Sequence, residues 1–166
     1  MINFKKIIIA LLIISGTSFC SAAQISFQVV QHDESAKDVT EQSYIIEDSL
    51  LTGFFENGYI VTNSPASVAS TSDDDLKLFN TGIGEASQGY SDFFVQIRLY
   101  YGKANSPSAN YSELQKVEWE AVNTKNGNKI ATDSIKDLSV GIKEKDLKKV
   151  SSDLILEIFN ALKTKK

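Results

Sequence analysis

The segment from Asp92 to Tyr101 carries the most regular pattern in the sequence, because two sets of side chains alternate along its whole length. One set is large and apolar: Phe93, Val95, Ile97, Leu99 and Tyr101. The other set is mixed: Phe94, Gln96, Arg98 and Tyr100. Successive side chains of a strand point to opposite faces of a sheet. We therefore predict a long strand whose apolar set faces helices and whose mixed set is at least partly wet.

Strand and helix signals alternate along the rest of the chain. Strand patterns cover 25–30, 59–61, 114–124 and 129–134, and Asn126-Gly127 is typical of a hairpin turn between the last two. Helix patterns cover 38–56, 72–88 and 143–163. The predicted fold is a single α+β domain of order β-α-β-α-β-β-β-α. It has a mixed or antiparallel sheet of about five strands, with about three helices packed mainly on one face.

Local signals place several boundaries of these elements. Asp38 with Glu41 resembles a capping box at the start of the first helix. The composition of 62–71 predicts a loop, after which Ser72 opens the second helix with three aspartates in its first turn. Gly82 and Gly84 weaken that helix but allow close approach to a neighbour, and we expect it to end or kink near Gly89.

The first 23 residues have the layout of a secretory signal peptide. Lys5 and Lys6 precede an apolar run over 7–14, and Ala23 closes a small-residue stretch that predicts cleavage before Gln24. The predicted organisation is therefore a signal peptide over 1–23 and a globular domain over 24–166. An uncleaved membrane anchor is disfavoured because such a helix needs about 20 apolar residues. A lipid anchor on Cys20 is the remaining alternative, although Phe19 is not the small residue that a lipidation motif requires.

Removal of the signal peptide changes the chemistry of the chain. The loss of two lysines takes the formal net charge from −4 to −6, and the sole cysteine leaves with them. An acidic domain is poorly suited to nucleic acid or to an anionic membrane surface, so neither is predicted as a partner. Without cysteine, the processed chain has no disulfide and depends on an apolar core.

The sequence predicts no catalytic residue, no metal site and no cofactor. His32 is the only histidine, and we interpret it as an exposed loop residue; a zinc or copper site would gather several His or Cys ligands. No Gly-x-Ser-x-Gly motif accompanies it. The aspartates over 73–75 suit a helix N-terminus, and Gly82-Ile83-Gly84 lacks the rest of a phosphate loop.

The acidic pair Glu118 and Glu120 shares one strand face at about 7 Å. That spacing fits a glycosidase pair, but alternating charge on a wet sheet face produces it as well. Phe94, Arg98 and Tyr100 are the candidate partner-binding residues, because aromatic residues and arginine dominate binding hot spots. The alternative is that these three side chains cover the sheet or pack beneath the loop over 102–112.

Several phrases of the chain resemble one bacterial envelope module. They are Glu47 to Val61, Tyr90-Ser91-Asp92-Phe93-Phe94-Val95, Val117-Glu118-Trp119 and Asn126-Gly127. The module occurs in LpoB-type penicillin-binding-protein activators, in the curli secretion protein CsgG and in the N-terminal domain of TolB. The resemblance implies a non-catalytic periplasmic or secreted accessory module that docks on another envelope protein. The alternative function is a secreted small-ligand-binding protein or hydrolase that uses the open sheet face. A retained, lipidated Cys20 would make the module a tethered one.

Overall fold

Five strands form one mixed sheet in the order β2-β1-β3-β4-β5. The computed structural model describes residues 22–104 and 111–163; the predicted signal peptide up to residue 21, with Cys20, lies outside them. The strands are β1 (Gln24–His32), β2 (Ile60–Val68), β3 (Phe93–Lys103), β4 (Ser112–Asn123) and β5 (Lys129–Ile135). The helices are α2 (Glu41–Glu56), α3 (Ser72–Gln88) and α4 (Glu144–Lys163). The element order and the α+β class are those that the sequence predicts.

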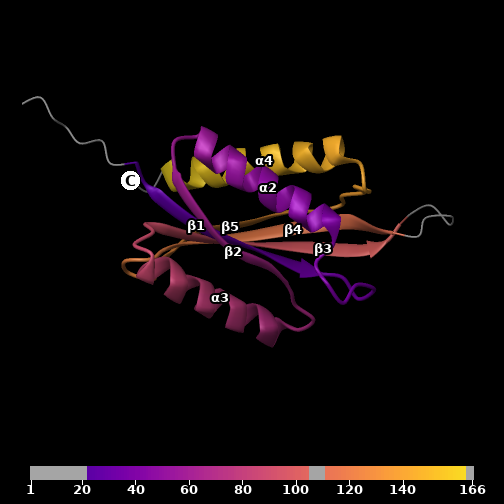
Figure 1. Ribbon diagram of the computed structural model, residues 1–166, viewed down its shortest axis with the longest axis horizontal. Helices are drawn as coiled ribbons and strands as arrows, with labels where there is room; N and C mark the ends of the chain where they lie inside the picture. The colour runs from indigo at the N-terminus through magenta and orange to yellow at the C-terminus, as the bar shows by residue number, and fades with distance from the viewer. Residues whose placement is uncertain (1–21, 105–110, 164–166) are drawn as a thin grey trace, which may run out of the picture.

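Strand β1 pairs in parallel with β2 on one side and with β3 on the other. The crossover through α2 and the crossover through α3 therefore run in opposite directions across the sheet. Because both kinds of crossover are right-handed, the two helices must lie on opposite faces. Figure 1 shows this arrangement: α2 and α4 cover one face, and α3 covers the other. β4 and β5 extend the sheet as antiparallel strands beyond β3.

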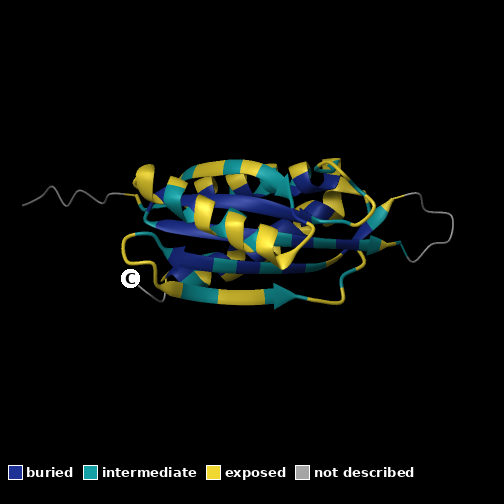
Figure 2. Cartoon of the chain, turned by 90° about the horizontal axis from the view of Figure 1, so that it is seen from below, coloured by how far each residue is buried: buried dark blue, intermediate teal, exposed yellow. Residues whose placement is uncertain are grey.

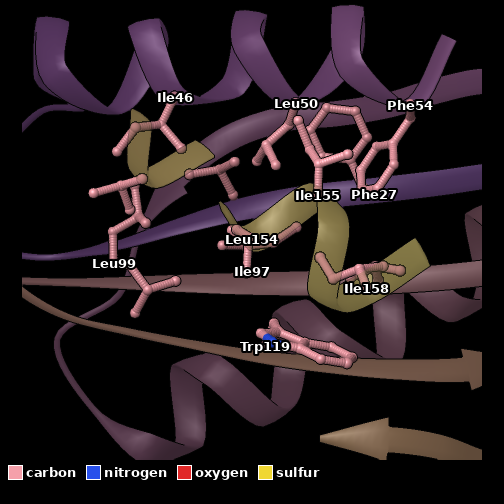
Figure 3. Packing of buried hydrophobic residues seen from close by; sticks show 14 of the residues in the cluster. Phe27, Ile46, Leu50, Phe54, Ile97, Leu99, Trp119, Leu154, Ile155 and Ile158 are labelled. Carbon is pink, nitrogen blue, oxygen red and sulfur yellow. The ribbon is translucent and has the colours of Figure 1, made fainter. Parts of the chain in front are cut away.

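The main core lies between the sheet and the pair α2 and α4. The strands contribute Phe27, Ile97 and Trp119, and the helices contribute Leu50 and Leu154, all of them buried (Figure 3). Truncation of such side chains to alanine removes apolar contacts and leaves a cavity, at a cost of about 2–5 kcal/mol each. This layer therefore stabilises the packing of α2 and α4 on one face of the sheet, and α3 packs on the other face.

A second, smaller core lies beneath α3. Phe94 and Val122 from the sheet pack against Ala86 and Phe79 of the helix. Gly82 permits this contact, because a Cβ atom there would lie 2.3 Å from Cζ of Phe94. The close approach expected of these small residues is confirmed at Gly82, whereas at Gly84 nothing lies within 4 Å. Figure 2, which views the molecule from the α3 side, shows exposed residues along the helix and buried ones along the strands behind it.

The cover of α3 corrects the prediction that the mixed side-chain set of β3 is partly wet. Phe94 and Gln96 are fully buried, and only the later members Arg98 and Tyr100 remain partly exposed. The sequence pattern of β3 is correct, but both faces of this strand carry a helix along part of its length. That burial follows from the opposite directions of the two crossovers and not from the pattern of β3 itself.

Two boundaries differ from the sequence prediction. β2 continues through Pro65 to Val68, where a loop was expected, because an edge strand tolerates a proline and the pairing with β1 shifts register beside it. α2 begins at Glu41 with Thr40 as its N-cap in place of Asp38. The backbone N–H of Thr40 donates to Oε1 of Gln31 at 2.8 Å, which fixes the turn there.

The boundaries of α3 agree well with the sequence. Thr71 is the N-cap, and its hydroxyl accepts from the backbone N–H of Asp74 at 3.1 Å. The Asp74 carboxylate accepts from the backbone N–H of Thr71 at 3.1 Å, which completes a capping box. The helix ends at Gln88 with Gly89 as its C-cap, as expected.

Candidate binding groove

A groove of about 1090 Å³ lies where β1 and β3 end, beside the N-terminus of α3. In open sheets with helices on both faces, ligands bind outside the carboxyl ends of the strands, at the point where the crossovers diverge. Here that point is between β1 and β3, since α2 and α3 leave the sheet on opposite faces. The described residues that line the groove are His32, Asp33, Glu34, Ser35, Ala69, Ser70, Tyr100, Tyr101, Gly102, Lys103, Ala104, Tyr111 and Ser112.

His32 lines this groove and is not the exposed loop residue that the sequence suggested. It is the last residue of β1 and pairs in register with Tyr100. Its Nε2 atom lies 3.0 Å from Oδ1 of Asp75, in the first turn of α3, and only 17% of its side chain is exposed. The prediction failed because β1 runs on to residue 32 and α3 begins directly across from its end.

Tyr100 stacks on His32, with ring centroids 4.5 Å apart and an angle of 12° between the rings. The Tyr100 hydroxyl donates to Oε2 of Glu118 at 2.9 Å. The ammonium of Lys116 lies 3.8 Å from the centroid of the Tyr100 ring, on the neighbouring strand β4. These contacts hold the ring in one orientation at the edge of the groove.

Glu118, the acceptor of the Tyr100 hydroxyl, also pairs with two positively charged side chains. Its Oε1 accepts from Nζ of Lys116 at 3.0 Å, and its Oε2 lies 3.7 Å from Nε of Arg98. Burial acts to raise the pKa of Glu118, but the hydrogen bonds from Lys116 and Tyr100 and the two positive charges outweigh it and lower that pKa. Burial and the bond to Glu118 raise the pKa of Tyr100 to about 12. At neutral pH, Tyr100 is thus a neutral donor and Glu118 a carboxylate.

A buried polar network holds the loop over 33–40, which forms another wall. Oε1 of Gln31 accepts from the hydroxyl of Ser43 at 2.7 Å and from the hydroxyl of Thr40 at 3.0 Å. The Gln31 amide donates to the carbonyl oxygen of Asp38 at 3.1 Å. Ser43 also lies 3.0 Å from the hydroxyl of Tyr101, whose pKa burial raises to about 12. The loop is thereby tied to β1, α2 and β3 at once.

The groove continues around this loop into a second hollow of about 520 Å³. The two hollows share Asp33, Ser35, Tyr111 and Ser112 in their linings. The hydroxyl of Ser35 donates to Oδ1 of Asp33 at 2.6 Å and lies 3.0 Å from the hydroxyl of Ser112. Ser35 therefore sits on the ridge that separates the two hollows.

The structure separates the three candidate partner-binding residues of β3. Phe94 is fully buried against Phe79, with ring centroids 5.8 Å apart, so its side chain offers no surface to a partner. Tyr100 lines the groove. Arg98 lies two residues before Tyr100 on the same strand and pairs in register with Glu118 of β4.

The acidic pair of β4 is likewise divided between two partners. Glu118 belongs to the Tyr100 cluster, whereas Oε1 of Glu120 lies 2.7 Å from Nζ of Lys129 on β5. Both carboxylates are thus engaged in ion pairs, which is the outcome expected of alternating charge on a sheet face. Sequence reasoning missed the joint role of His32, Asp75 and Glu118. His32 and Asp75 share a signal, the end of β1 and the first turn of α3, whereas Glu118 lies in the middle of β4 opposite Arg98 and carries no such signal.

Across 22–104 and 111–163, no three His, Cys, Asp or Glu side chains gather closely enough to hold a metal ion. Within the same ranges, none of the helices combines the length and the apolar character needed to cross a membrane.

A family model described as "Uncharacterised protein" matches residues 24–163. No curated protein matches the chain. Among solved structures, a PelC dodecamer from Paraburkholderia phytofirmans is similar at 12% identity and a TM-score of 0.50, over 85% of this chain and 87% of that one. At this identity, the likeness shows a shared fold.

Two further structures are similar over most of this chain. Lipoprotein GNA1162 from Neisseria meningitidis matches at 15% identity and a TM-score of 0.46, over 83% of this chain and 99% of that one. TolB from Acinetobacter baumannii matches at 11% identity and a TM-score of 0.41, over 84% of this chain and 28% of that one. The predicted resemblance to LpoB-type activators and to CsgG stays a prediction.

Proposed function

We propose that this chain is an exported, non-catalytic binding module of the bacterial cell envelope. It belongs to the family described as "Uncharacterised protein", whose model matches residues 24–163. In this proposal, it docks on another envelope protein through the groove at the ends of β1 and β3. The observation that carries the proposal is the His32–Tyr100 stack, because it places a fixed aromatic surface at the topological switch point of the sheet.

The contacts of the groove support binding and not chemistry. Nε2 of His32 is engaged by Asp75 and so is not directed at a nucleophile. Glu118 has a lowered pKa, which suits a permanent carboxylate and disfavours a general acid at neutral pH. The raised pKa of Tyr100 keeps its hydroxyl protonated, so it is a donor and not a base. Such rigid, paired groups provide a preorganised surface for a partner.

The sequence supports an envelope location. The predicted signal peptide over 1–23 would send the domain out of the cytoplasm, and processing before Gln24 would leave a chain without cysteine. If Cys20 is instead retained and lipidated, the same domain and groove would be tethered to a membrane. The mass of the first peptide of the exported protein distinguishes these two forms.

Photo-crosslinking in intact cells tests the docking proposal. A photoreactive amino acid replaces Glu34 or Ser70, two exposed residues that line the groove. The matched control positions are Leu156 and Asn160, exposed residues of α4 on the opposite face of the sheet. We expect both groove positions to capture the same envelope protein and both control positions to miss it. Capture from α4 alone would contradict the proposal.

The size of the groove favours a small-ligand-binding protein as the second candidate. A volume of about 1090 Å³ matches the upper range of small-molecule pockets. Native mass spectrometry of the protein purified from its own envelope separates the two candidates. A bound small molecule that Tyr100→Ala abolishes, together with no protein adduct at Glu34 or Ser70, would favour this second function.

A further inference from the structure

The first residue of β1 is held by Asp92, the residue just before β3. The backbone N–H of Gln24 donates to Oδ2 of Asp92 at 2.9 Å, and the backbone N–H of Asp92 donates back to the carbonyl oxygen of Gln24 at 2.8 Å. Lys125 lies 2.6 Å from Oδ1 of the same carboxylate. The Gln24 side-chain amide donates to the carbonyl oxygen of Gly89 at 3.0 Å. Both nitrogens of Gln24 are therefore engaged.

The nitrogen that faces Asp92 is the atom that the predicted processing would change. Signal peptidase would hydrolyse the Ala23–Gln24 peptide bond: water adds across it, Ala23 leaves with a carboxylate, and Gln24 keeps an amine that takes up a proton at neutral pH. The neutral N–H donor then becomes an ammonium beside a carboxylate. The bond already has a charged acceptor, and processing adds a positive charge on the donor, so that a direct Coulomb attraction to the Asp92 carboxylate is added to the hydrogen bond.

We propose that Asp92 is a built-in binding site for the N-terminal ammonium of the processed chain, so that cleavage before Gln24 locks β1 onto β3. This inference rests on the export in the proposed function and not on the groove. Asp92 and Lys125, from the segments before β3 and after β4, bring a negative and a positive charge to this end of the sheet. With Lys125 on its other oxygen, the Asp92 carboxylate bridges two cations.

The geometry also orders the events of processing. The carbonyl oxygen of Ala23 accepts from the backbone N–H of Ile60 at 3.0 Å, so in the folded domain the bond to be cut is already paired with β2. A peptidase binds its substrate in an extended, accessible form. Cleavage therefore precedes the pairing of β1 with β2, and the new ammonium meets Asp92 as the sheet forms.

The same contacts protect Gln24 from cyclisation. An N-terminal glutamine forms pyroglutamate when its amine attacks its own side-chain carbonyl carbon; a new C–N bond forms and the side-chain nitrogen leaves as ammonia. In the folded, processed chain the protonated amine would be paired with the Asp92 carboxylate, and the side-chain nitrogen that would leave is hydrogen-bonded to the carbonyl oxygen of Gly89. The exported protein should therefore retain an intact Gln24, and Asp92→Asn should speed the loss of ammonia.

A thermal unfolding cycle tests the ammonium site. Asp92→Asn is made in a chain that begins at Gln24 and in a chain that begins at Ala22, both otherwise complete to Lys166. The bond between Ala23 and Ile60 exists only in the longer chain, but it cancels because each variant is compared with its own parent. We expect Asp92→Asn to lower the melting temperature by about 3 °C more in the chain that begins at Gln24.

The control is Asp153→Asn on the exposed side of α4, which should act equally in both chains. An equal effect of Asp92→Asn in both chains would overturn the proposal. So would a mature mass that begins at a residue other than Gln24, or one that shows complete pyroglutamate in the folded protein. None of these results depends on the photo-crosslinking at Glu34 and Ser70, so failure of one proposal is distinguishable from failure of the other.

Discussion

The imidazole of His32 and the phenol ring of Tyr100 lie nearly parallel, 4.5 Å apart, across the ends of two neighbouring parallel strands. Each ring is held from behind by a carboxylate: Asp75 of α3 holds His32, and Glu118 of β4 holds Tyr100. The stack therefore joins four elements, β1, β3, α3 and β4, at the place where the groove opens. Substitutions that break a contact of the stack in any of the four elements should therefore change both the free energy of unfolding and binding at the groove.

The hydroxyl of Tyr100 and its ring make separable contributions to this contact. Tyr100→Phe removes the hydrogen bond to Glu118 but keeps the stack on His32, and we expect it to lower the free energy of unfolding by about 1 kcal/mol. Tyr100→Ala removes both contacts and should cost about 1–2 kcal/mol more. Urea unfolding of the two variants measures both values. Equal costs would mean that the ring contact contributes nothing.

Alkaline pH should weaken the fold through tyrosines whose pKa burial raises, above all Tyr100 and Tyr101. Tyr100 and Tyr101 have pKa values raised from 10.0 to about 12, mainly because burial disfavours the phenolate. A raised folded-state pKa contributes stability that is fully present below pH 10 and is lost as the pH rises toward 12. We expect the free energy of unfolding to fall over that interval. Tyr101→Phe should flatten the fall, whereas Tyr90→Phe, at an 88% exposed position, should leave it unchanged.

Two glycines of α3 should respond to alanine with opposite signs. At Gly82 the new Cβ would lie 2.3 Å from the Phe94 ring, so Gly82→Ala must displace the helix or the ring and lower the free energy of unfolding. At Gly84 nothing lies within 4 Å, so Gly84→Ala should raise it by about 0.5–1 kcal/mol through helix propensity alone. Thermal unfolding compares them directly. A stabilising Gly82→Ala would contradict the packing of α3 on Phe94.

The N-cap of α3 should stabilise the first turn of the helix, which carries Asp75, the hydrogen-bond partner of His32. Thr71→Ala removes the hydroxyl that accepts from the Asp74 N–H and should cost about 1 kcal/mol. Thr71→Ser keeps that acceptor and serves as the matched control. Hydrogen exchange should rise across the first turn of α3 in the alanine variant only. Unchanged protection there would show that the capping box does not hold this turn.

The pattern of β3 predicted both the long strand and its apolar face, because a period of two depends on local sequence alone. The burial of Phe94 and Gln96 depends instead on the strand order, which no local pattern records: with β1 between β2 and β3, α3 must cross the other face. The same non-local cause explains His32. Its partner Asp75 is 43 residues away in the chain and becomes a neighbour only when α3 docks at the end of β1.

β2 shows a different limit. Its residues 62–68 have a loop-like composition, rich in serine and with a proline, and yet they pair with β1. An edge strand needs backbone hydrogen bonds on one side only and so tolerates a proline, and none of the β2 side chains is buried, so they carry no alternating apolar pattern. The groove could therefore be placed from the sequence no more closely than the loop over 102–112 and the wet part of β3.

Photo-crosslinking from the groove, made in intact cells, tests the central claim most directly. We predict that photoreactive residues at Glu34 and Ser70 give one shared adduct with an envelope protein, and that Tyr100→Ala reduces its yield by at least about tenfold, as the loss of a hot-spot contact would. Leu156 and Asn160 should give no such adduct. An adduct of equal yield with and without the Tyr100 ring, or one formed only from α4, would contradict the account.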